Sequence, residues 1–130
     1  MGLINSKSMD MRGLEVEAKL FTTDPDETTT TVTQTTNRST GVTLNATAGQ
    51  ITTDTTSLAA AAEATFTVTN SYVTAKTVPV VALASGAAAT PLVFVSAVAA
   101  GSFDITITNL HASTGETGAL VINFVLHDVV

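Results

Sequence analysis

The chain of 130 residues contains no cysteine and no tryptophan, and it has one tyrosine and two histidines. Without cysteine, neither a disulfide nor a thiolate-bound metal can form. A zinc site would need carboxylate ligands beside His111 and His127, because there is no third histidine. With Tyr72 as the single tyrosine, a sugar site built on stacked aromatic rings is also poorly supported. We therefore expect neither a metal nor a cofactor.

Charged residues are also few, since they make up 12% of the chain. Five of them are basic and eleven are acidic. A formal net charge of -6 leaves no basic footprint for nucleic acid and no polybasic segment for anionic lipid. No run reaches the roughly 18 continuous apolar residues of a membrane span. The most apolar stretch, residues 78–100, is broken by Pro79, Gly86 and Pro91 and is interpreted as two strands and a turn. The N-terminus shows no signal-peptide pattern. We expect no nucleic-acid partner and no membrane partner.

Motifs for catalysis are missing as well. The Gly-x-Ser-x-Gly elbow of serine hydrolases is absent, and the five acids after residue 27 are scattered rather than paired. The acidic residues at 24–27 lack the glycine and the ligand spacing of a calcium loop, so a solvated turn is the simpler interpretation. Residues 115–118 are interpreted as a hairpin turn. We expect no catalytic residue and a protein that is not an enzyme.

Threonine and alanine take the place of charge, and threonine favours the pleated surface of a sheet. From residue 28 onward, short apolar or alternating segments are separated by turn residues. Such a pattern predicts seven or eight strands in an all-β domain over residues 28–130, a β-sandwich or jelly roll. The segments are a strand around Val32 after a threonine-rich linker that could also be disordered, then residues 42–44, 50–52, 65–69, 78–83, 92–95, 102–108 and 120–126.

Three of these segments carry more specific expectations. Alternation directs Phe66 and Val68 to one face of their strand, and it directs Phe103, Ile105 and Ile107 inward on theirs. Residues 120–126 are apolar at almost every position, which predicts a central strand covered on both faces. The alanine-rich residues 58–64 have high helix propensity, but seven residues are too few to hold a helix, so we expect a single turn.

An internal echo is visible around two of the strands. In residues 58–70 and again in 98–109, an apolar residue and two alanines precede a strand that ends in Thr-Asn. We expect Asn70 and Asn109 to close their strands by capping their own turns. Chance similarity in a chain rich in alanine and threonine is the alternative.

The first 27 residues differ from the rest because they hold nine of the sixteen charged residues. Within them, apolar and charged residues alternate with the period of a half-buried strand, which is favoured over a helix from Ser8 because Gly13 would interrupt it. We expect residues 1–27 to form an N-terminal arm for attachment or for exchange between subunits. Its partner-binding residues are predicted to be Leu14, Glu15, Val16, Glu17, Ala18, Lys19 and Leu20.

A series of short motifs between residues 32 and 124 resembles a module of structural proteins in tailed bacteriophages. The motifs are Val32-Thr33-Gln34, Ser39-Thr40-Gly41-Val42-Thr43-Leu44-Asn45, Gly49-Gln50-Ile51-Thr52, Phe66-Thr67-Val68-Thr69-Asn70, Val98-Ala99-Ala100-Gly101-Ser102-Phe103 and Ile122-Asn123-Phe124. The resemblance implies a virion protein with a β-sandwich fold, often trimeric. The sequence departs from the module before Phe66, where Ala61-Ala62-Glu63 replaces the usual Ala-Gly turn.

The resulting functional hypothesis is a capsid decoration, or cement, protein. It would be made in the bacterial cytoplasm and would bind the major capsid protein on the outside of the phage head, as a homotrimer. Its subunit interface is predicted at apolar positions of two strands, Val93 and Val95 or Val121 and Val125. The alternatives are a fibre, baseplate or head-tail component of the same virion, or a module that binds a glycan or protein on the host surface.

Overall fold

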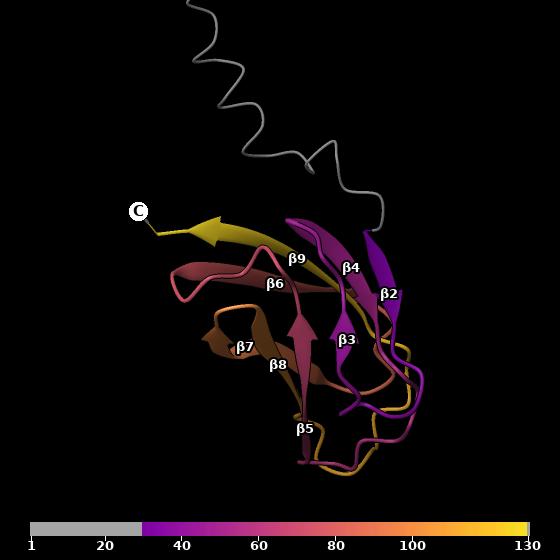
Figure 1. Cartoon of the computed structure of the whole chain (residues 1–130). Helices are drawn as coiled ribbons and strands as arrows, with labels where there is room; N and C mark the ends of the chain where they lie inside the picture. The colour runs from indigo at the N-terminus through magenta and orange to yellow at the C-terminus, as the bar shows by residue number, and fades with distance from the viewer. Residues whose placement is uncertain (1–29, 130) are drawn as a thin grey trace, which may run out of the picture.

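The computed structural model describes residues 30–129, which form eight strands and no helix (Figure 1). The strands are β2 (Thr31–Thr33), β3 (Val42–Thr43), β4 (Ala48–Thr52), β5 (Glu63–Thr69), β6 (Thr77–Ser85), β7 (Pro91–Ala99), β8 (Ser102–Asn109) and β9 (Val121–Asp128). They form two four-stranded sheets, with the orders β2-β4-β9-β6 and β3-β5-β8-β7. The predicted all-β sandwich is therefore confirmed, with strands where the sequence pattern places them.

The strand pairing is mixed in direction. Four of the pairs are antiparallel, but β2 pairs with β4 in parallel and β3 pairs with β5 in parallel. Jelly rolls belong to the antiparallel architectures, so the finer prediction of a jelly roll is not confirmed. Both parallel pairs lie at sheet edges, where β2 and β3 are also the shortest strands.

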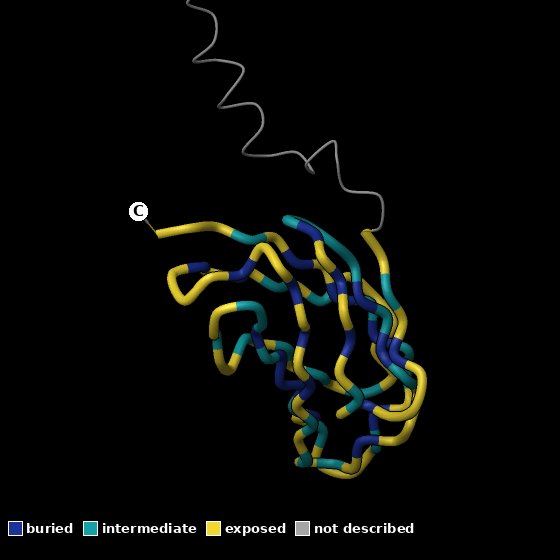
Figure 2. The backbone as a smooth tube through the Cα atoms, in the orientation of Figure 1, coloured by how far each residue is buried: buried dark blue, intermediate teal, exposed yellow. Residues whose placement is uncertain are grey.

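The core lies between the two sheets and is built mainly by alternation along the strands. Phe66 and Val68 of β5 are buried opposite Ile105 and Phe103 of β8, as the sequence predicts. From the other sheet, Phe124 meets Phe103 edge to face, with ring centroids 5.5 Å apart. Figure 2 shows this alternation, since buried and exposed residues follow one another along the strands of both layers.

The apolar strand β9 is central in its sheet, between β4 and β6, as expected. The expectation that it is covered on both faces is wrong within residues 30–129. Its inner residues Ile122 and Phe124 are buried, but Asn123 and Val125 on the outer face are exposed. Residues 30–129 form two layers, and none of these residues makes a third layer over this face.

The alanine-rich segment before β5 forms a single turn, as predicted, closed by a hydrogen bond from the Ala62 amide to the Ala59 carbonyl. Ala61 adopts a positive φ of 61° in this turn, and Gly101 adopts a φ of 87° in the turn before β8. The echo therefore extends to backbone conformation, and Ala61 takes the position where such turns favour glycine. The departure of the sequence from the phage module falls on this residue.

Both strands of the echo also end alike. Asn70 and Asn109 are fully buried. Their side-chain oxygens accept hydrogen bonds from the amides two residues further on, those of Tyr72 and His111. The prediction that asparagine caps these turns is confirmed.

Candidate functional site

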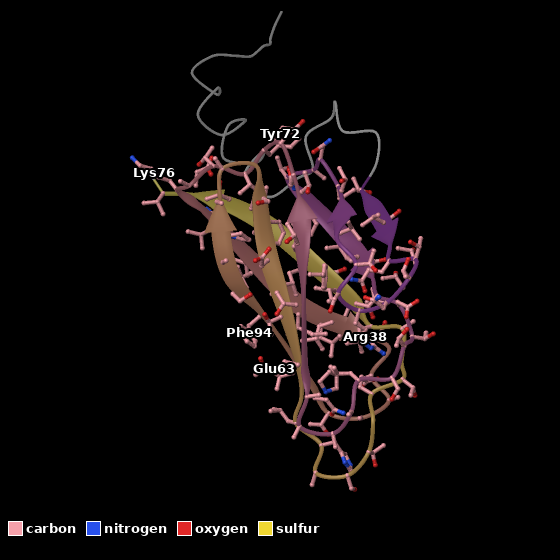
Figure 3. All side chains as sticks on the ribbon, turned by 60° about the horizontal axis from the view of Figure 1, so that its bottom comes forward. Arg38, Glu63, Tyr72, Lys76 and Phe94 are labelled. Carbon is pink, nitrogen blue, oxygen red and sulfur yellow. The ribbon has the colours of Figure 1, made fainter. Side chains whose placement is uncertain are left out.

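Two ionic side chains that the sequence analysis does not single out lie inside the described fold. Arg38 is 3% exposed and Glu116 is not exposed at all. Arg38 follows β2 and Glu116 lies in the long connection from β8 to β9. Arg38 lies among loops toward the end of the sandwich opposite Tyr72 and Lys76 (Figure 3).

The guanidinium of Arg38 donates four hydrogen bonds to groups from two segments of the chain. Its Nε donates to the Thr56 carbonyl at 2.6 Å, and one terminal nitrogen donates to the Thr53 hydroxyl at 3.0 Å. The other terminal nitrogen donates to the carbonyls of Glu116 and Gly118, at 3.1 and 2.8 Å. This planar fork of donors is the geometry that arginine, and not lysine, provides.

The Glu116 carboxylate receives only backbone amides. The amides of Ala88 and Ala89, in the turn between β6 and β7, donate to it at 2.8 to 3.1 Å. The amide of Gly118 donates at 2.7 Å. The backbone of Glu116 also forms a two-bond bridge with Leu58. Residues 115–118 therefore belong to a connection between the two sheets, and their interpretation as a hairpin turn is wrong.

The electrostatics of this network favour the charged form of Glu116, whereas burial outweighs the nearby carboxylates at Arg38 and leaves its pKa lowered. Burial alone would raise the pKa of Glu116, but the three backbone amides and the charge of Arg38 outweigh it and leave the pKa lowered. Burial lowers the pKa of Arg38, while the carboxylates of Glu116 and Asp54 oppose that shift. The Asp54 carboxylate accepts hydrogen bonds from the side chain and the backbone of Thr56, which lower its pKa.

The network has a structural role, because the side chains of Arg38 and Glu116 are buried and form hydrogen bonds with other groups of the fold. It joins four loops, at residues 34–40, 53–58, 86–89 and 116–120, across both sheets. The backbones there are in close contact, because a Cβ on Gly118 would lie 1.7 Å from the Gly86 carbonyl oxygen. We therefore interpret Arg38 and Glu116 as the polar latch of the sandwich end and not as catalytic groups.

The two histidines do not gather ligands around them. The His111 Nδ1 accepts hydrogen bonds from the amides of Ser113 and Thr114, and His127 is exposed near the end of β9. Among residues 30–129, no group of three or more histidine and acidic side chains could hold a metal ion.

The outer face of the sheet β3-β5-β8-β7 is coated with hydroxyl groups that bond to one another. The Thr65 and Thr106 hydroxyls are 2.7 Å apart, and Thr106 also donates to Ser96. On the next row, Thr67 donates to Asp104 at 2.7 Å. At the β7 edge of this face, Leu92 and Phe94 are the exposed apolar residues (Figure 3).

The outer face of the other sheet, β2-β4-β9-β6, is different because it presents valine. Val78 and Val80 of β6 are 44% and 50% exposed, and Val125 of β9, which pairs with Val80, is 38% exposed. Ala82 and the half-buried Val121 lie on the same face by strand alternation. These five residues are called the valine face below.

The predicted interface residues are thus divided by the structure. Val121 and Val125 lie together on the valine face, whereas Val93 and Val95 pack half-buried against the core. Their neighbours Leu92 and Phe94 point outward instead. The structure does not bring the two pairs onto one surface, and of the two alternatives only the β9 pair lies on an outer face.

The exposure of Val78 and Val80 cannot be predicted from the sequence, because a nearly continuous apolar run has no alternation that would distinguish the inner face of the strand from the outer one. The sequence does contain an indication that Arg38 is buried, since it is the only arginine after residue 12. A lone arginine in a segment so poor in charge is a candidate for burial. The arm residues Leu14, Glu15, Val16, Glu17, Ala18, Lys19 and Leu20 lie outside the described residues.

Comparison with models of known families, with curated proteins and with solved structures finds no match to this chain. In the part of the chain that the structure describes, no helix is long and apolar enough to cross a membrane.

Proposed function

We propose that this chain is a structural subunit of a larger assembly, and specifically a capsid decoration protein on the outer surface of a tailed-phage head. The observation that carries the assembly role is the valine face, a charge-free apolar strip on the central and edge strands of one sheet. Contiguous exposed apolar surface of this kind is typical of interaction sites. The resemblance of residues 32–124 to phage structural modules points to a virion as the assembly, and within the virion we propose the head.

The physical logic of such a protein is mass action. A subunit that binds the assembled shell and not the broken one stabilises the shell by about 2.7 kcal/mol per site at a hundredfold excess over the dissociation constant. Weak contacts repeated by symmetry over many sites then add up to a tougher particle. A rigid sandwich closed by buried polar bonds suits this role, because it loses little conformational freedom on binding.

In this proposal the arm contacts the major capsid protein. The acids Glu15, Glu17, Asp24, Asp26 and Glu27 would meet basic groups on the shell. Exposed ion pairs weaken as salt screens them, so attachment is expected to fall in part as ionic strength rises.

The test compares phage heads with and without the protein. Heads that lack it are expected to assemble normally and to release DNA at a lower temperature, and adding the purified protein back is expected to restore the release temperature. Electron microscopy of the restored heads should show density at many equivalent sites on the shell. Density confined to the tail or to the head-tail junction would support a fibre, baseplate or connector instead. Equal thermal stability with lost adsorption to cells would replace the proposal with host-surface binding.

A further inference from the structure

The two outer faces of the sandwich differ in what they can bind. On the face of β3-β5-β8-β7, the hydroxyl groups of Thr65, Thr67 and Thr106 already form hydrogen bonds within the sheet. The valine face presents apolar side chains, which form no hydrogen bonds with water. They lie on the paired strands β6 and β9, which have nine and eight residues. Burying apolar area is favourable by about 25 cal/mol per Å², so covering this face stabilises whatever complex covers it.

The edges of the described sheets argue against a partner that adds a strand. The edge strand β6 contains Pro79, which has no amide to donate, and its register with β9 shifts near its end. The edge strand β7 has a bulge between Val95 and Ala97, and the other two edges are only three and two residues long. Such edges are the devices that prevent strand pairing between molecules. The contact is therefore expected to be face to face, through side chains.

Charge favours a second copy as the occupant. Residues 30–129 carry two basic and five acidic residues, a net charge of -3, so two copies repel each other over most of their surface. The valine face contains no charged residue. Its polar neighbours on the same face include Asn123 and Gln50, which bond to each other, the exposed His127, which pairs with Val78, and Thr52, which pairs with Val121. A basic or acidic partner would find no complement there, whereas an identical face meets no repulsion.

The size of the face allows a weak contact. The four strands hold 25 residues, and at about 3.3 Å along a strand and about 4.8 Å between strands they give a sheet face of roughly 400 Å². Two copies would then bury about 800 Å² in total, which is below the size of standard interfaces. An oligomer of this size is expected to form at micromolar concentration rather than at nanomolar concentration.

We propose that a second copy of this chain covers the outer face of β2-β4-β9-β6, with Val78, Val80 and Val125 at the centre of the contact. This deepens the proposed function, on which it rests, by naming the surface through which copies of the decoration subunit associate. A contact between two identical faces has two-fold symmetry, so it pairs subunits and differs from the trimer that the resemblance implies.

The experiment is sedimentation equilibrium of the full chain and of two matched variants. Val80→Lys places a charge at the centre of the valine face, while Leu92→Lys places the same charge on a residue of similar exposure on the opposite sheet. The wild type and Leu92→Lys are expected to sediment as the same oligomer at 10 to 100 micromolar. Val80→Lys is expected to raise the dissociation constant at least tenfold, and its unchanged circular dichroism would show that it is folded. Val80→Thr, which keeps the shape and the strand propensity, gives a smaller shift in the same direction and guards against misfolding of the lysine variant.

A monomeric wild type at these concentrations overturns the inference, as does an oligomer that Val80→Lys leaves intact or that Leu92→Lys dissociates. These outcomes are separate from the proposed function, because attachment of wild-type protein to phage heads is measured independently. A monomer that still decorates heads would refute the contact surface alone. An oligomer that fails to bind heads would refute decoration alone.

Discussion

At the scale of single residues, Arg38 and Glu116 are the two ionic side chains that the described fold buries, and burying a charge is costly. A buried charge costs several kcal/mol unless it is paired and hydrogen-bonded. Here the arginine has four acceptors and the carboxylate has backbone amides at both oxygens. Removing the Glu116 carboxylate leaves three backbone amides without their acceptor, and removing the Arg38 guanidinium leaves four acceptors without their donor. Either loss is therefore expected to be costly by itself.

We predict that Glu116→Gln destabilises the protein by about 2 to 4 kcal/mol at pH 7, because an amide nitrogen would face backbone donors and Arg38 would lose its countercharge. The pKa of Glu116 is lowered by folding. Its contribution is therefore complete above the unfolded pKa of about 4.3 and is lost as pH falls through the lower folded pKa. Urea unfolding should give a constant difference between variant and wild type from pH 7 to 5, and a shrinking one in stronger acid.

The matched control is Glu63→Gln on β5, where the side chain is exposed and accepts one bond of 3.3 Å from Thr108. Its effect is expected to stay within about 0.5 kcal/mol, as for ordinary surface changes. If both substitutions cost the same, or if the Glu116→Gln deficit grows in acid, the latch does not hold a charged carboxylate.

At the scale of elements, β5 and β8 are built to one plan. Each begins after a turn that contains a residue of positive φ. A buried asparagine lies at the far end of each, since Asn70 directly follows β5 and Asn109 is the last residue of β8. The two strands are antiparallel neighbours, and the Asn70 amide donates to the Gly101 carbonyl while the Asn109 amide donates to the Ala62 carbonyl. Each turn thus satisfies the end of the partner strand, which explains why the same residue types recur.

Ala61 and Gly101 adopt positive φ in the two turns, and exchanging alanine and glycine at these positions should change the stability of the protein in opposite directions. Ala61 at positive φ is strained by about 1 kcal/mol or more, so Ala61→Gly is expected to be neutral or to stabilise by up to about 1 kcal/mol after the entropy of glycine is counted. Gly101→Ala meets no atom within 4 Å but takes a φ of 87°. It should therefore destabilise through backbone strain alone, by about 1 to 2 kcal/mol. Thermal unfolding of both variants measures the pair, and a clear loss of stability in Ala61→Gly would contradict the left-handed turn.

At the scale of the whole molecule, the chain divides into a sandwich with few charges and an N-terminal segment that holds most of them. Within residues 30–129, a continuous core and the polar latch are already in place. We therefore predict that the N-terminal 27 residues serve attachment rather than the fold of the described domain.

Deleting residues 1–27 is expected to leave the unfolding temperature within about 2 °C of wild type and to abolish attachment to phage heads. Replacing Glu15 and Glu17 with glutamine in the full chain should weaken attachment and reduce its dependence on salt, because ion pairs with the shell are lost. Co-sedimentation with heads at several salt concentrations measures both. Full attachment of the truncated protein would exclude the arm as the binding segment.

The sequence by itself determined the elements of this protein, because strand alternation and turn chemistry are local. Phe66, Val68, Phe103, Ile105 and Ile107 could be directed inward from a period of two, and Asn70 and Asn109 could be recognised as strand ends. The absence of cysteine and the scarcity of basic residues likewise limited the possible chemistry before any fold was known.

Only the tertiary structure decided which strands share a sheet and which groups meet between them. Arg38 and Glu116 are 78 residues apart, and no local pattern brings a guanidinium to that distant carbonyl. In the same way, continuous apolar runs in β6 and β9 do not reveal that Val80 and Val125 lie on an outer face as neighbours. Local periodicity fixes how side chains alternate along a strand, but burial depends on which elements pack above and below it, and that is set by contacts between residues far apart in the chain.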